Sequence, residues 1–237
     1  MRVGDGLRLP YRSEFGAPGP LLLFLHGQGE IDGAHVARTS VHGPWLKHRA
    51  NANVSNALGG YFRVAPHLTG ESDWNPDRLR DLVKQVREEH ADAAQDALFV
   101  IGISLGGSGA LDLVAAHGQE LNVRGAVVCC PANIRNLDAA LEQAPIYLFH
   151  GDGDGKVSLD KQRSDAYDNR NERANFRWVR VNRDWTRLQN HHDCWTEVIA
   201  HPDLYSWFSD LLRNHPDYSR QKNLWPAFAN LSRPKGP

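Results

Sequence analysis

The sequence predicts an α/β fold, with a mostly parallel central sheet and helices on both faces, and three observations predict it. Short apolar runs recur along the 237 residues, as expected for strands buried inside a sheet. Stretches with helical spacing separate these runs, which indicates crossover connections between parallel strands. Hydrophobic residues make up 41% of the chain and charged residues 23%, so a chain of this length can bury one sizeable core.

Six apolar runs, rich in Val, Ile, Leu, Phe or Tyr, are the predicted strands. They span residues 20–26, 61–66, 96–103, 123–130, 144–150 and 175–181. Their largely continuous apolar character indicates that several are covered on both faces.

Four stretches between and after these runs are the predicted helices. They span residues 76–90, 105–117, 159–170 and 194–213. In the first stretch, apolar residues recur at helical spacing from Leu79 to Val86, and Pro76 suits the first turn. Pro202 is expected to break the last stretch into two helices.

The remaining segments are a long connection over residues 27–60 and a tail over residues 214–237. Long ordered loops in compact domains are often functional, so the first segment is expected to border a site. No linker or repeat divides the chain, and we expect one domain over residues 1–213. The tail is expected either to pack on that domain through its few apolar residues or to stay partly extended and dock a partner.

Charge and cysteine content exclude several functions. The formal net charge is −1, which favours neither nucleic acid nor anionic membranes as partners. No apolar run approaches the roughly 18 residues of a membrane span, and the beginning of the sequence lacks the apolar core of an export signal. The cysteines are Cys129, Cys130 and Cys194, an odd number with two adjacent, so no disulfide framework is implied. We therefore expect a reduced, cytoplasmic protein.

The segment Gly102-Ile103-Ser104-Leu105-Gly106 carries the strongest chemical signal. It fits the pattern G-x-S-x-G, with a predicted strand before it and a predicted helix after it, which is the context of a nucleophile elbow. Strand and helix approach closely at such a turn, so side chains at 102 and 106 would collide. The glycines therefore make room for an exposed nucleophile, Ser104, above a helix N-terminus that favours developing negative charge.

A serine nucleophile needs a base that is oriented by an acid, and in this arrangement both follow the serine along the chain. One predicted strand ends at two carboxylates, Asp152 and Asp154. The residues His191 and His192 follow the last predicted strand. The positions alone leave both acids and both histidines as candidates.

Metal binding is a weaker reading of the same residues. A calcium loop that starts at Asp152 would place Lys156 and Arg163 where oxygen ligands are needed. The adjacent residues from His191 to Cys194 include ligand types, but neighbours in sequence rarely converge on one ion. We therefore expect no metal.

An oxyanion hole would complete the site. The backbone N–H of Leu105, directly after the serine, is the first expected donor, and a loop after an earlier strand supplies the second. That loop is His26-Gly27-Gln28-Gly29, in which glycines flank Gln28 and let its N–H turn toward the site.

Together these motifs resemble the compact α/β-hydrolase esterases, namely the phospholipase/carboxylesterase group and the prolyl-oligopeptidase-like predicted peptidases. The resemblance runs from about Leu21 to Leu212 and rests on LHGQGE, VHGPW, VAPHLTGESDW, GISLGG, HGDGDGKV and HHDCW. It implies the α/β-hydrolase fold, with Asp154 as the acid and His192 as the base, and Asp152 and His191 as second choices. It further implies a serine carboxylesterase that needs no cofactor.

The short predicted connection after Cys130 leaves no room for a large lid, which favours a small, accessible acyl ester as substrate. Trp45 and Trp74 either line an acyl pocket or pack in the core. Three alternatives stay open: the same residues serve a peptidase or amidase, they serve cofactor-free transfer or peroxidase chemistry, or the fold is catalytically idle and binds a partner. The sequence is compatible with a homodimer but does not require one.

Overall fold

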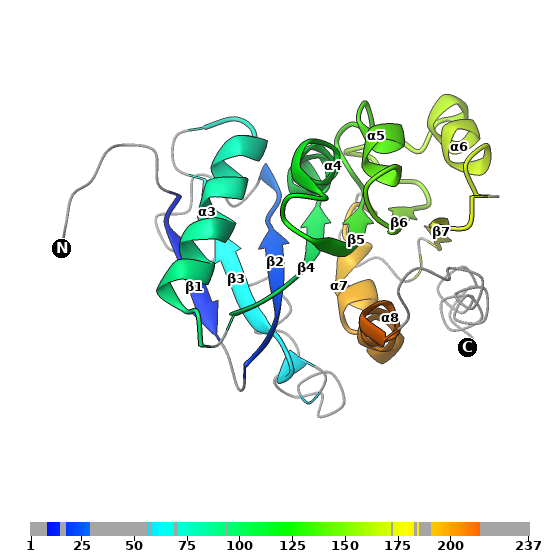
Figure 1. Cartoon of the computed structure of the whole chain (residues 1–237). Helices are drawn as coiled ribbons and strands as arrows, with labels where there is room; N and C mark the ends of the chain where they lie inside the picture. Colours follow the sequence, from blue (N-terminus) through cyan, green and yellow to red (C-terminus); the bar gives the residue numbers. More distant parts are fainter. Residues whose placement is uncertain are drawn as a thin grey trace.

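The described part of the chain forms one seven-stranded sheet with helices on both faces (Figure 1). A computed structural model describes residues 9–14, 18–28, 56, 58–68, 71–92, 94–171, 173–182, 184 and 191–213. The strands are β1 Tyr11–Glu14, β2 Gly19–Leu25, β3 Phe62–Pro66, β4 Ala94–Ile103, β5 Val123–Cys129, β6 Ile146–Gly151 and β7 Phe176–Val181. Their order across the sheet is β1-β3-β2-β4-β5-β6-β7, and only β1 is antiparallel. The predicted fold class is confirmed.

The helices follow the sequence pattern closely. They are α3 Pro76–Glu89, α4 Leu105–His117, α5 Leu137–Leu141, α6 Lys161–Asp168, α7 Trp195–Ile199 and α8 Pro202–Arg213. The four predicted helical stretches are confirmed, including the break before Pro202. The sequence analysis missed β1 and α5, because elements of four and five residues are too short to show a period. Among the described residues, no helix has both the length and the apolar character needed to cross a membrane.

The two faces of the sheet bury separate sets of apolar side chains, as the alternation along a strand requires. On one face, Leu21, Leu23 and Leu25 of β2 pack in a cluster with residues of α3, α4, α5 and α6. On the other, Leu22 and Phe24 lie in a cluster with residues of α7 and α8. Both faces are therefore covered, as predicted from the continuous apolar strands.

Helix α8 is held to the sheet by stacked aromatic rings. Trp207 stacks on Tyr147 of β6 with ring centroids 4.0 Å apart, and Phe208 stacks on Phe99 of β4 at 4.4 Å. Leu211 takes the space above Gly125 of β5, where a Cβ would meet its Cδ1 at 2.6 Å. This packing anchors α8 on β4, β5 and β6, three parallel strands whose carboxyl ends point to one edge of the sheet.

Candidate active site

Ser104 occupies the turn between β4 and α4 in an unusual backbone conformation. Its φ is 53° and its ψ is −117°, a region that residues other than glycine rarely adopt. Its N–H donates to the Cys129 carbonyl at 2.8 Å, and its own carbonyl accepts from Ala132 N–H at 3.1 Å. Hydrogen bonds from the neighbouring strand and loop thus hold the strained turn, and the side chain stays partly exposed.

The glycines around Ser104 are required by close backbone contacts. A Cβ on Gly102 would lie 2.1 Å from the Gly106 carbonyl oxygen, and a Cβ on Gly106 would lie 2.1 Å from the Leu25 carbonyl oxygen. Neither backbone atom can move aside as a flexible side chain would. The predicted reason for the glycines is therefore confirmed.

A hydrogen-bonded chain joins Ser104, His192 and Asp154. His192 Nε2 lies 2.9 Å from Ser104 Oγ, and His192 Nδ1 lies 2.7 Å from Asp154 Oδ2. An ionised carboxylate only accepts, so Nδ1 carries a proton, and in the neutral imidazole Nε2 can accept from the serine hydroxyl. The arrangement can pass a proton from Ser104 to an imidazole that a carboxylate orients.

Asp154 is buried and its two oxygens have separate partners. Oδ1 accepts from the backbone N–H groups of Lys156 at 2.8 Å and Val157 at 2.9 Å, which leaves Oδ2 for His192. Burial raises the pKa of Asp154, but the hydrogen bonds from His192 and the two amides outweigh burial and lower the pKa below its ordinary value. The carboxylate is therefore ionised near neutral pH.

His192 lies on the loop that leads into α7. Burial lowers its pKa, but hydrogen bonds to Asp154 and Cys130, together with nearby negative charge, raise the pKa to about 9. The Trp195 ring meets the imidazole edge-on, with centroids 5.1 Å apart. Directly before it, His191 has a φ of 57°, so the backbone is bent where it presents His192.

Asp152 and His191, the second choices for the acid and the base, lie outside this hydrogen-bonded chain. The Asp152 side chain is 47% exposed, with its carboxylate 3.9 Å from the Arg180 guanidinium. His191 is partly exposed, and its Cδ2 borders Gly153. His192 accepts from the serine hydroxyl and donates to Asp154, so the structure brings together the pair that the family resemblance preferred.

The two expected oxyanion donors are adjacent in sequence to residues at the nucleophile: Leu105 follows Ser104, and Gln28 follows Gly27. A Cβ on Gly27 would lie 3.3 Å from Ser104 Cβ, so the turn after β2 lies against the nucleophile. Gln28 follows and is exposed. Leu105 is the first residue of α4, where backbone N–H groups have no acceptor within the helix.

The tryptophans suggested as pocket residues have different outcomes. Trp45 lies outside the described residues. Trp74 is only 3% exposed, packs its ring where a Cβ on Gly109 would lie, and donates from Nε1 to the His26 carbonyl at 3.1 Å. These contacts favour the packing alternative for Trp74.

An open depression of about 820 Å³ lies beside Trp74, between the start of α3, the middle of α4 and α5. Its polar lining includes Asp112, which already accepts from Arg135 and Asn136. Ser104, Asp154 and His192 are not among its lining residues. The depression is therefore separate from the hydrogen-bonded chain.

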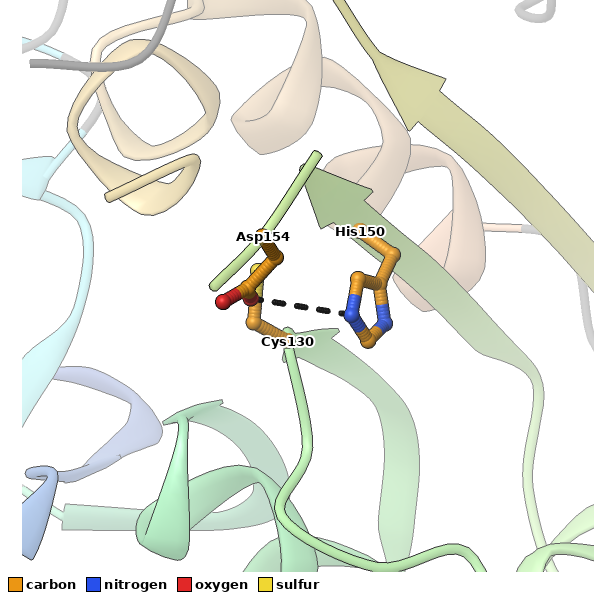
Figure 2. Close-up of side chains that lie close together, drawn as sticks. All are labelled: Cys130, His150 and Asp154. Carbon is orange, nitrogen blue, oxygen red and sulfur yellow. Dashed lines mark ion pairs between the residues drawn. The ribbon is translucent and has the colours of Figure 1, made fainter. Parts of the chain in front are cut away.

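Cys130, His150 and Asp154 form a buried group whose donor atoms all lie within 4.8 Å of one another (Figure 2). Their hydrogen bonds do not fit a metal. His150 Nε2 faces the Val157 carbonyl at 2.9 Å and must carry its proton, and both Asp154 oxygens are occupied. Burial raises the pKa of the Cys130 thiol well above its ordinary value, so no thiolate is offered.

Two histidines that the sequence analysis did not single out support the site from behind. His26 directly follows β2 and His150 is the last residue but one of β6, and both are completely buried. Each directly precedes a glycine at the end of an apolar strand, and this repeated His-Gly pair is the signal that could have identified them.

Neither a protein-family model nor a curated protein matches the sequence. Among solved structures, a thermostable esterase has a TM-score of 0.66 at 18% identity, over 85% of this chain and 59% of that one. The chain thus spans less than two thirds of that esterase.

Two others are covered more completely. A thermostable carboxyl esterase from Bacillus coagulans has a TM-score of 0.54 at 16% identity, over 83% of this chain and 91% of that one. LpqC, a poly(3-hydroxybutyrate) depolymerase from Bordetella parapertussis, has a TM-score of 0.52 at 13% identity, over 90% of this chain and 87% of that one. The parallel sheet, the turn at Ser104 and these neighbours lead to one conclusion: the chain has the α/β-hydrolase fold.

Proposed function

We propose that this protein is a serine hydrolase of the carboxylesterase type, in which Ser104, His192 and Asp154 form the catalytic triad. One observation carries the proposal: a serine held at a positive φ at the end of a strand is hydrogen-bonded to a histidine that a buried carboxylate orients. This combination of strain and buried charge is costly to maintain and has no evident packing role.

In the proposed reaction Ser104 Oγ attacks the ester carbonyl carbon while His192 Nε2 takes the hydroxyl proton. The negative charge of Asp154 stabilises the imidazolium that forms. The tetrahedral intermediate collapses as the C–O bond to the leaving alcohol breaks, and His192 donates its proton to that alcohol. Water then attacks the acyl-enzyme by the same route, releases the acid and regenerates Ser104.

The backbone N–H groups of Gln28 and Leu105 are the proposed oxyanion donors. Gln28 follows Gly27, which lies against Ser104, and Leu105 follows Ser104 and begins a helix whose N-terminus favours negative charge. Such donors stabilise the charge that develops on the carbonyl oxygen in the transition state.

The proposed substrate is a small, accessible ester. The connection from β5 to β6 contains only the five-residue α5, which is too short for a large lid. The printed descriptions of the similar structures, an esterase, a carboxyl esterase and a polyester depolymerase, support carboxylic esters as the substrate class.

The test is labelling with a fluorophosphonate probe together with hydrolysis of p-nitrophenyl acetate and a longer-chain ester. Wild type should be labelled and should turn over at least one ester. Ser104→Ala should lose labelling and reduce turnover by roughly a millionfold, while its thermal unfolding stays near that of wild type. Labelling without ester turnover would redirect the search to amides or thioesters, and a folded wild type that does not label would overturn the proposal.

A further inference from the structure

His150 lies directly behind the proposed catalytic acid, and its two ring nitrogens have different partners. Nε2 is 2.9 Å from the Val157 carbonyl oxygen, and Nδ1 is 3.2 Å from the Tyr167 hydroxyl. A carbonyl only accepts, so Nε2 carries the proton and Nδ1 accepts from the tyrosine. Burial raises the pKa of Tyr167 to about 12, which keeps the proton on that hydroxyl.

Val157 is consequently held at both of its backbone polar groups. Its N–H donates to Asp154 Oδ1 at 2.9 Å, and its carbonyl accepts from His150. Because this N–H and that of Lys156 occupy Oδ1, the carboxylate turns Oδ2 toward His192. The orientation of the acid thus depends on where the backbone of Val157 lies.

His150 does not compete with His192 for the carboxylate. Its Nε2 is 3.6 Å from Asp154 Oδ2, beyond hydrogen-bond distance, although the ring faces the carboxylate (Figure 2). Burial lowers the pKa of His150 to about 4, so the ring is neutral and adds no full charge beside Asp154. Its effect on the acid must pass through Val157.

We propose that His150 is a positioning residue for the acid: it fixes Val157 so that Asp154 keeps one oxygen on the backbone and presents the other to His192. The proposal rests on the proposed function, since it assigns Asp154 as the acid. His150 is completely buried and lies behind the carboxylate, where it does not meet the substrate. The Tyr167 hydroxyl donates to Nδ1 and so holds the ring in the orientation in which Nε2–H meets the Val157 carbonyl.

Three variants and one control test this role. His150→Leu removes both hydrogen bonds, whereas His150→Gln keeps an N–H close to the position of Nε2. Tyr167→Phe removes only the hydroxyl that donates to His150 Nδ1. The control is Trp178→Phe, which loses the Nε1–H bond to Asp168 and some packing on the Tyr167 ring, but no bond of His150.

The first readout is the low-field proton NMR resonance of His192 Nδ1–H bonded to Asp154, assigned by its loss in Asp154→Asn. It needs no substrate. The second is the rate of fluorophosphonate labelling. His150→Leu should lose or strongly shift the resonance and label about 100-fold more slowly, as for a displaced catalytic group. His150→Gln should keep the resonance and label within about tenfold of wild type, and Tyr167→Phe should fall between the two.

An unchanged resonance and labelling rate in a folded His150→Leu variant would overturn the proposal. If that variant does not fold, Tyr167→Phe decides: a resonance shifted relative to Trp178→Phe supports the role, and equal resonances overturn it. The two proposals can fail separately. A wild type that shows the resonance but neither labels nor hydrolyses esters would overturn the proposed function, and the resonance would still decide the role of His150.

Discussion

The sequence H-G-x-G occurs twice at strand ends, at residues 26–29 directly after β2 and at 150–153, where it begins in the last two residues of β6. Both histidines are completely buried, and burial lowers the pKa of each to about 4. The first turn, which begins at His26, borders the proposed oxyanion hole. The second turn, which begins at His150, leads directly to the proposed acid, Asp154. A buried neutral histidine therefore supports each of two parts of the site that need different chemistry.

The two histidines use opposite tautomers. His26 Nε2 accepts from the Leu68 backbone N–H at 3.2 Å, so its Nδ1 carries the proton and donates to the Gly27 carbonyl at 2.7 Å. In His150 the proton is on Nε2, because Nε2 faces the Val157 carbonyl, which can only accept, and Nδ1 accepts from the Tyr167 hydroxyl. A backbone N–H selects the tautomer in the first turn, and a backbone carbonyl selects the opposite one in the second. The same local sequence thus acquires its function from residues that are distant along the chain.

The largest expected effect is the difference in kcat between variants of the two carboxylates in the second turn, Asp152 and Asp154. Asp154→Asn should reduce kcat on the order of ten-thousandfold, because the amide no longer fixes the tautomer of His192 or stabilises its charge. Asp152→Asn is the matched control, and it should change kcat by less than about threefold, since its side chain is half exposed beside Arg180. Steady-state kinetics on an activated ester measures both. A larger loss from Asp152→Asn would reassign the acid.

The next effect concerns how tightly the turns are packed. A Cβ on Gly106 would lie 2.1 Å from the Leu25 carbonyl and 2.6 Å from that of His26, so α4 presses on the backbone of the first turn. Gly153 in the second turn has a φ of 74°, but its Cβ would meet only His191 Cδ2 at 3.6 Å. Gly106→Ala should therefore lower the free energy of unfolding by about 3 kcal/mol, through forced backbone movement.

Gly153→Ala is the matched variant, and it should cost about 1 kcal/mol, through its left-handed conformation alone. Urea unfolding followed by circular dichroism measures both free energies. If both variants lost the same free energy of unfolding, the backbone of the first turn would have moved to accommodate a Cβ at position 106, against what the packing around Gly106 indicates.

A smaller loss of activity is expected when the first turn loses its hydrogen bond from the Trp74 side chain. Trp74→Phe removes the Nε1–H donated to the His26 carbonyl and leaves that buried oxygen with one hydrogen bond fewer. We expect kcat to fall by about tenfold with KM nearly unchanged, because a displaced oxyanion loop weakens transition-state binding. Pre-steady-state acylation of p-nitrophenyl acetate separates this step from deacylation. A change in KM alone would instead place Trp74 in the substrate pocket, as the alternative from the sequence held.

The sequence predicted the strands and the nucleophile turn well, because each depends on local pattern. Continuous apolar runs identify buried parallel strands, and the glycines around Ser104 reflect contacts within one strand–turn–helix unit. The edge strand β1 and the short α5 were missed, because neither is long enough to show a period.

The choice between Asp152 and Asp154 could not follow from local pattern. It depends on the backbone of Val157 and on His192, which folding brings together from separate segments. The roles of His26 and His150 depend in the same way on Leu68 and Tyr167. Pattern therefore locates the turns, and long-range packing decides what each does.

The smallest expected effect is a shift in the midpoint of the pH profile of kcat/KM. This shift should occur in variants of the second turn and not in variants of the first. An ordinary histidine predicts that kcat/KM rises through about pH 6–7. Burial lowers the pKa of His192, but the bonds to Asp154 and Cys130 raise it to about 9. Protonated His192 cannot accept the serine proton, so activity should be low at acidic pH and rise with a midpoint above 6.5. His26 and His150 stay neutral over this range and should add no second step.

Variants of the two turns should change this profile differently, because only the second turn acts on the pKa of His192. Tyr167→Phe loosens the support of Asp154 and should lower the midpoint toward 6.5. Trp74→Phe acts on the oxyanion side and should leave the midpoint where wild type has it. Profiles of kcat/KM from about pH 5 to 10 measure both. Equal midpoints in the two variants would mean that His150 does not transmit the position of Tyr167 to the acid, and the functional difference between the turns would then rest on Asp154 alone.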